Sequence, residues 1–163
     1  RFIFRGVPAE HSLLERALLL TPDVKLSAAL LSGIEAQMAR LTSVIRDRLR
    51  DAFMTGDGAR SLDALAAMTA HTRRSLERHL ADAGFVSGTR LLDAVRIVAG
   101  YTAITRSTVP LESIARMLGC MVRTMDAQFV LMIGVTCSGL RAEPMAVEEV
   151  AGRIARRLTD REK

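Results

Sequence analysis

A run of charged side chains between residues 72 and 78 has the chemistry to read base pairs. The guanidinium groups of Arg73, Arg74 and Arg78 can donate paired hydrogen bonds to O6 and N7 of guanine. The carboxylate of Glu77 can accept a hydrogen bond from the N4 amino group of cytosine. Thr72, which precedes them, is suited to capping a helix or binding a phosphate. These residues are therefore candidates for contacts with double-stranded DNA.

The elements that would position these side chains occur twice in the sequence. SLDALA at residues 61–66 corresponds to PLESIA at residues 110–115. Each half predicts a short helix, a tight turn and a second helix with basic residues at its start, closed by Gly84 or Gly134. This order is that of a helix-turn-helix, whose second helix presents its first turns to base edges. We expect recognition helices at about 72–83 and 123–133, joined by a helix that could place them in successive major grooves.

The stretch from residue 61 to residue 141 resembles the DNA-binding domain of the AraC/XylS family of bacterial transcription regulators. The matching segments are LERHL at 76–80 with Gly84, LLDAVR at 91–96, and IARMLG at 114–119 with GVT at 134–136. The resemblance implies a sequence-specific regulator that binds double-stranded DNA, with RNA polymerase as a further candidate partner. The family usually has Arg where this chain has Ala127, an aromatic or apolar residue where it has Cys120, and often Pro where it has Cys137. The second unit is therefore expected to bind DNA weakly or mainly through phosphates.

The same residues also have a simpler interpretation as a solvated surface. In an arbitrary helix these charges would more often face water, with Arg78 paired to an acid such as Asp82. Because two predicted helix-turn-helix units occur at this separation, DNA contact is the favoured interpretation for the charged residues of the first recognition helix. Arg123 and Thr124, which hold the matching places in the second helix, are evenly balanced between the two interpretations. The alternative function is a protein-interaction or dimerisation module whose helix-turn-helix units no longer bind DNA tightly.

The residues before the first unit predict one long amphipathic helix. Leu31, Ile34, Met38, Leu41 and Ile45 are spaced by three and four, as in the seam of a coiled coil. This seam would lie either on the helix's own domain or against a second copy in a homodimer, and the spacing does not decide between them. We expect an all-α chain, apart from a fragment that could end an α/β domain. Its expected parts are an N-terminal regulatory fragment at 1–26, the long helix at 27–55, a linker at 56–60, the DNA-binding domain at 61–141 and a helical tail at 142–163.

Basic residues are spread over the whole chain. The formal net charge is +5 and almost all of the basic residues are Arg, which suits nucleic acid, a membrane surface or an acidic partner. Within the tail, an amphipathic helix is expected over about 147–157. Arg153, Arg156 and Arg157 could touch the DNA backbone, but Glu148 and Glu149 favour an ordinary solvated helix.

The remaining reactive residues predict neither a catalytic site nor a metal or cofactor site. Cys120 and Cys137 do not form a Cys-x-x-Cys pair, and we expect buried or half-buried thiols. His71 and His79 have no acidic residue at ligand spacing. No apolar run is long enough to span a bilayer, and nothing demands an oxidising compartment. We therefore expect a cytoplasmic protein that is neither an enzyme nor embedded in a membrane.

Overall fold

The computed structural model describes residues 20–56 and 61–160, and every regular element in these two stretches is an α-helix. The predicted all-α class is therefore confirmed for this part of the chain. Residues 1–19 of the predicted N-terminal regulatory fragment and residues 57–60 of the predicted linker lie outside the described residues. Within the described part, none of the helices has both the length and the apolar composition that a membrane span requires. The helices are α2 (Val24–Gly33), α3 (Glu35–Ala39), α4 (Ser43–Thr55), α5 (Leu62–Met68), α6 (Arg73–Ala83), α7 (Gly88–Arg106), α8 (Leu111–Met117), α9 (Val122–Ile133), α10 (Cys137–Ala142) and α11 (Val147–Thr159).

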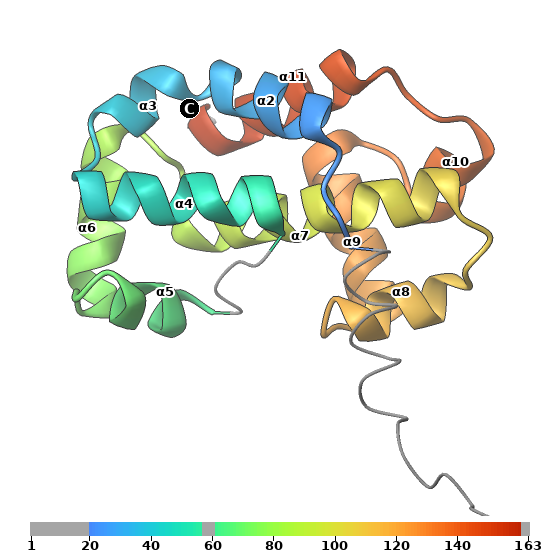
Figure 1. Cartoon of the computed structure of the whole chain (residues 1–163), viewed down its shortest axis with the longest axis horizontal. Coiled ribbons are helices and arrows are strands. Elements are labelled where there is room, and N and C mark those ends of the chain that lie inside the picture. The colour runs from blue at the N-terminus through green and yellow to red at the C-terminus, as the bar shows by residue number, and fades with distance from the viewer. Residues whose placement is uncertain (1–19, 57–60, 161–163) are drawn as a thin grey trace, which may run out of the picture.

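Helix α7 runs through the middle of the molecule, and the other helices are arranged around it (Figure 1). The pair α5–α6 lies toward one end of α7, and α8, α9 and α10 lie toward the other. Helices α4 and α11 also pack on α7, and α2 lies against both of them. The two predicted helix pairs are thus held on one shared central helix.

The boundaries of the paired helices follow local signals in the sequence. The hydroxyl groups of Ser61 and Thr72 each accept a hydrogen bond from the backbone N–H three residues on, which caps α5 and α6. Helices α6 and α9 end at Gly84 and Gly134, whose φ angles are 100° and 83°. Glycine adopts this left-handed conformation without the steric penalty that a Cβ atom brings. The predicted starts of α5 and α6 and the predicted ends of α6 and α9 are therefore confirmed.

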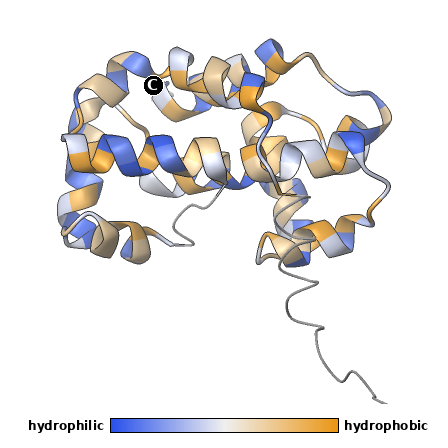
Figure 2. Cartoon of the chain, in the orientation of Figure 1, coloured by the Kyte–Doolittle hydropathy of each residue, from blue (hydrophilic) through white to orange (hydrophobic). Residues whose placement is uncertain are grey.

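The prediction of one long helix over residues 27–55 is wrong. The segment forms α2, α3 and α4, with interruptions at Ile34 and at residues 40–42. Helix α4 alternates hydrophilic and hydrophobic residues along its length, as a helix with one solvated and one buried face does (Figure 2). The interruptions let the chain bend, so the apolar faces of successive helices cover the same core.

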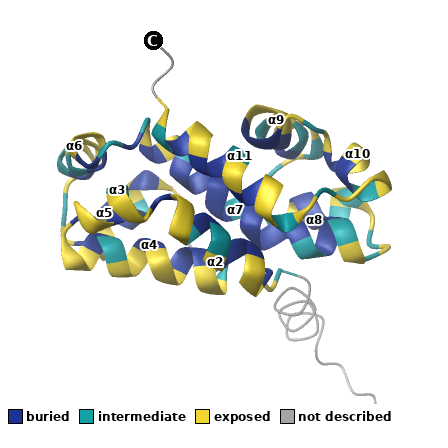
Figure 3. Cartoon of the chain, turned by 90° about the horizontal axis from the view of Figure 1, so that it is seen from above, coloured by how far each residue is buried: buried dark blue, intermediate teal, exposed yellow. Residues whose placement is uncertain are grey.

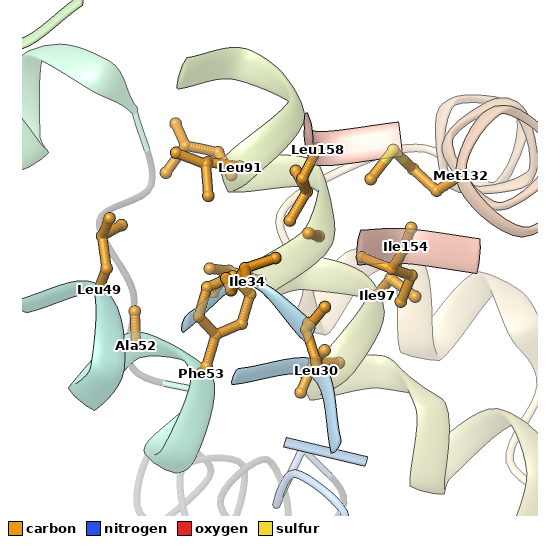
Figure 4. Packing of buried hydrophobic residues seen from close by; sticks show 14 of the residues in the cluster. Leu30, Ile34, Leu49, Ala52, Phe53, Leu91, Ile97, Met132, Ile154 and Leu158 are labelled. Carbon is orange, nitrogen blue, oxygen red and sulfur yellow. The ribbon is translucent and has the colours of Figure 1, made fainter. Parts of the chain in front are cut away.

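The predicted dimer seam belongs to the core of a single chain. Ile34 and Ile45 are fully buried, and Met38 and Leu41 are at most 5% exposed, whereas Leu31 is partly buried. Figure 4 shows Ile34 beside Phe53, among apolar side chains from α2, α4, α7 and α11. Side chains covered within one chain cannot also contact a second copy. The dimer interpretation of this seam is therefore wrong.

The tail helix α11 is amphipathic, as predicted, but it is not an ordinary solvated helix. Val150, Ile154 and Leu158 are fully buried, and the helix packs along α2. The two backbones approach closely, since a Cβ atom added to Gly33 would lie 3.1 Å from the Cβ of Ala155. Helix α11 is thus a structural part of the core, although it follows the segment that resembles a DNA-binding domain.

Replacing Ile34 with Ala should lower the free energy of unfolding by about 2–4 kcal/mol, because the change empties a fully buried position. Val44→Ala is the matched control: Val44 is 51% exposed on α4, and its loss should change stability by less than about 0.5 kcal/mol. Urea denaturation followed by circular dichroism measures both values. An Ile34→Ala protein as stable as the parent but lighter in sedimentation would restore the dimer interpretation.

Candidate nucleic-acid interface

Helices α6 and α9 lie along the same edge of the molecule. Seen from above, both are viewed nearly end-on at this edge, and α2 and α4 form the opposite edge (Figure 3). Each is held by the short helix that precedes it, α5 for α6 and α8 for α9. One extended ligand lying along this edge could therefore contact both helices.

The predicted DNA-contacting residues of the first unit lie together on the outer face of α6. Thr72, Arg73, Arg74, Glu77 and Arg78 are all exposed. The opposite face of the helix is buried and fixes its orientation. The sequence pattern thus identified a continuous polar surface over the first two turns of α6.

Ion pairs divide these charged residues into two sets. Arg73 lies 3.2 Å from Glu77 (Nε to Oε1) and 3.6 Å from Asp63 (Nη1 to Oδ2). By contrast, Arg74 and Arg78 form no ion pair with any described residue, and the expected pair between Arg78 and Asp82 is not formed. Exposed pairs of this kind contribute at most about 1 kcal/mol, so a ligand can displace them at small cost. On α6, the guanidinium groups of Arg74 and Arg78 can bind a ligand without first breaking an ion pair with a described residue.

The outer face of α9 is mostly apolar. Arg123 and Thr124 are exposed in its first turn, as the sequence pattern required. Beyond them the exposed face carries Ala127, Val130 and Leu131, the last two being 46% and 42% exposed. Sequence reasoning missed these two, because apolar residues in a helix are usually assigned to the core. The signal that could have found them is helical spacing: Ala127, Val130 and Leu131 follow Arg123 by four, seven and eight residues, which places them on the same face.

A buried carboxylate connects α9 to α7. Asp93 Oδ1 accepts hydrogen bonds from Gln128 Nε2 at 2.7 Å and from Arg96 Nη1 at 3.3 Å. Burial raises the pKa of Asp93 above its ordinary value, and the positive charge of Arg96 only partly offsets this effect. At the other end of the unit, the backbone N–H of Cys137 donates to Asp126 Oδ1 at 2.9 Å and so holds α10 against α9.

The described histidines and cysteines pack against other parts of the fold and do not form a reactive site. The rings of His71 and His79 meet edge to face, with centroids 5.1 Å apart, beside the turn between α5 and α6. Over residues 20–56 and 61–160, no group of three or more His, Cys, Asp and Glu residues could hold a metal ion. Cys137 is a buried thiol and Cys120 a partly buried one, as predicted, and burial raises the pKa of both. Neither thiol has the lowered pKa that activates a nucleophile.

No protein-family model, no curated protein and no solved structure matches this chain. The resemblance of residues 61–141 to the AraC/XylS DNA-binding domain therefore stays a prediction from the motifs named above. What α6 and α9 can bind follows from their position, their exposure and their charge.

The raised pKa of Asp93 makes stability depend on pH. The folded state holds this proton more tightly than the unfolded state, so the free energy of unfolding falls as pH rises from the ordinary value of 3.8 through the raised pKa. Asp93→Asn removes the charge and keeps an oxygen that can accept from Gln128. The wild type should therefore lose stability relative to this variant across that interval, and the difference should level off at higher pH.

Thermal unfolding followed by circular dichroism, from about pH 3 to about pH 7, measures this difference. Asp82→Asn, at an exposed position on α6, is the control for losing a surface carboxylate. Parallel stability curves for the wild type and Asp93→Asn would contradict the expectation.

Proposed function

We propose that this chain is a sequence-specific DNA-binding transcription regulator that presents α6 and α9 to the major grooves of double-stranded DNA. The observation that carries the proposal is the exposed, unpaired state of Arg74 and Arg78 among the described residues, on the first turns of α6. They stand on the edge of the molecule that α9 shares (Figure 3). An α-helix fits the major groove of B-DNA, and guanidinium groups on its first turns are well suited to guanine.

The ion pairs on α6 assign different roles to its charged residues. Arg74 and Arg78 are spaced by one helical turn, so they can reach neighbouring base pairs from one face. Arg73 and Glu77 hold each other, which leaves them better suited to orienting the surface than to reading a base. Thr72 caps the helix, and it stands where a phosphate can meet the N–H groups of the first turn.

The two helices are proposed to contribute unequally to recognition. Arg123 is the one basic residue on the described face of α9, and it suits a phosphate contact. Ala127, Val130 and Leu131 can touch thymine methyl groups but cannot form hydrogen bonds with bases. Sequence discrimination is therefore assigned mainly to α6.

The exposed apolar residues of α9 also favour a second candidate function. Met121 is 74% exposed just before α9, and Val130 and Leu131 continue the apolar surface along the helix. Exposed apolar surface of this kind often marks a protein-binding site. A protein-interaction module would give no salt-dependent retardation in a gel shift with DNA, whereas a regulator that neutralises phosphates would.

Arg74→Ala should reduce specific DNA binding by about 1–3 kcal/mol and relax the base preference at one position, because it removes a base-reading guanidinium. Arg123→Ala should weaken binding to all sequences more evenly and make the salt dependence shallower, as the loss of a phosphate contact does. Selection of bound sequences from random DNA, followed by titrations at two salt concentrations, measures both effects.

Arg48→Ala is the control for the loss of one exposed arginine, since Arg48 lies on α4 at the opposite edge. Circular dichroism verifies that all three variants fold. If Arg123→Ala abolishes base preference and Arg74→Ala leaves it intact, the assignment of the two helices is reversed. If the wild type selects no sequence and shows no salt-dependent binding, the proposed function fails.

A further inference from the structure

The C-terminal end of α11 lies between the two helix pairs. In Figure 3 this helix runs between α6 and α9, with its C-terminal end directed toward the edge that they share. The backbone N–H of Val86, in the segment that joins α6 to α7, donates to the carbonyl of Leu158 at 2.9 Å. On the other side, Arg153 Nη1 donates to the carbonyl of Ile133, the last residue of α9, at 2.6 Å. Hydrogen bonds thus tie α11 to both pairs, from its last turn on one side and from its middle on the other.

A hollow of about 430 Å³ opens between the end of α9 and one face of α11, and arginine side chains line it toward the C-terminal end of α11. Arg153 is occupied, because it binds the carbonyl of Ile133 and lies 2.7 Å from Glu149. Arg156 and Arg157 are exposed at the same hollow, and Asp160 is the acid beside them. By formal charge, the three arginines that line the hollow exceed its two acidic residues, Glu149 and Asp160, by one. Its charge therefore suits an anion.

We propose that Arg156 and Arg157 form a third DNA contact, in which they bind phosphodiester groups of the backbone between the two major grooves, an inference that rests on the proposed function. Two successive major grooves on one side of B-DNA are separated by a minor groove and its flanking phosphates. A protein that places α6 and α9 in those grooves brings the end of α11 against these phosphates. Guanidinium groups bind phosphate oxygens through parallel, charge-assisted hydrogen bonds.

The contact explains why basic residues gather at the end of a helix whose other face belongs to the core. Arginine in a last turn also interacts favourably with the helix dipole, and that role concerns the stability of α11 alone. The two roles differ in what they change. Loss of a dipole interaction lowers the melting temperature, whereas loss of a phosphate contact lowers the number of counterions released on binding DNA.

The test compares two double variants on a DNA site selected by the wild type. Arg156→Gln/Arg157→Gln removes the proposed contact, and Arg48→Gln/Arg50→Gln removes the same charge from α4 at the opposite edge. The slope of log K against log salt should become shallower by about 1–2 for the first variant, because each lost phosphate contact removes about 0.9. The second variant should keep the wild-type slope. Base preference should be unchanged in both.

A second measurement changes the DNA instead of the protein, and circular dichroism verifies that the variant compared with the wild type is folded. Uncharged methylphosphonate linkages are placed in the DNA between the two grooves. They should weaken binding by the wild type, and they should weaken it much less for Arg156→Gln/Arg157→Gln, because that variant has already lost the contact. Equal slopes for the two double variants, or equal sensitivity of wild type and variant to the neutral linkages, would overturn the proposal. If either of these results is found while the wild type still binds DNA in a way that depends on Arg74, the contact of α11 is overturned and the proposed function stands. If the wild type binds no DNA at all, both proposals are overturned.

Discussion

The burial of α7 on nearly all of its sides is the constraint on which the rest of the structure depends. Thirteen of its 19 residues are buried. Helices α4, α5, α8, α9, α10 and α11 all pack on it. Moving any of them would return apolar area to water, at about 25 cal/mol for each Å² uncovered. The relative position of the two helix pairs is therefore a property of the core and not of flexible connections.

One scaffold thus supports two helices with different surfaces. The outer face of α6 is charged, whereas that of α9 keeps one arginine at its start and is apolar beyond it. Burial of the opposite face gives each helix a fixed orientation, so the difference lies wholly in the exposed residues. A single change of surface chemistry can therefore alter what one helix binds without disturbing the other.

Sequence reasoning succeeded where the signal was local and failed where it depended on tertiary partners. Thr72 and Gly84 mark the ends of α6 because capping needs only the backbone of the same helix. The spacing from Leu31 to Ile45 fits a coiled-coil seam and a bent chain around a core equally well. Gly33 weakens the helix at the break before Ile34, but a single glycine does not fix a bend, and the packing of α2 on α4 and α11 decides it. Likewise, the pairing of Arg73 with Asp63 depends on how α5 meets α6, which spacing does not specify.

The packing of α2 along α11 also has a consequence for the order in which the chain can fold. These helices are neighbours in space, but more than a hundred residues separate Gly33 from Val147. Because a ribosome adds ~5–20 residues each second, roughly ten seconds pass between the synthesis of Leu26 and Leu30 and the completion of α11. During that interval the nascent chain exposes an apolar surface that its own later sequence must cover. A chaperone that binds short apolar helices would therefore have a binding site in α2 until α11 has been synthesised.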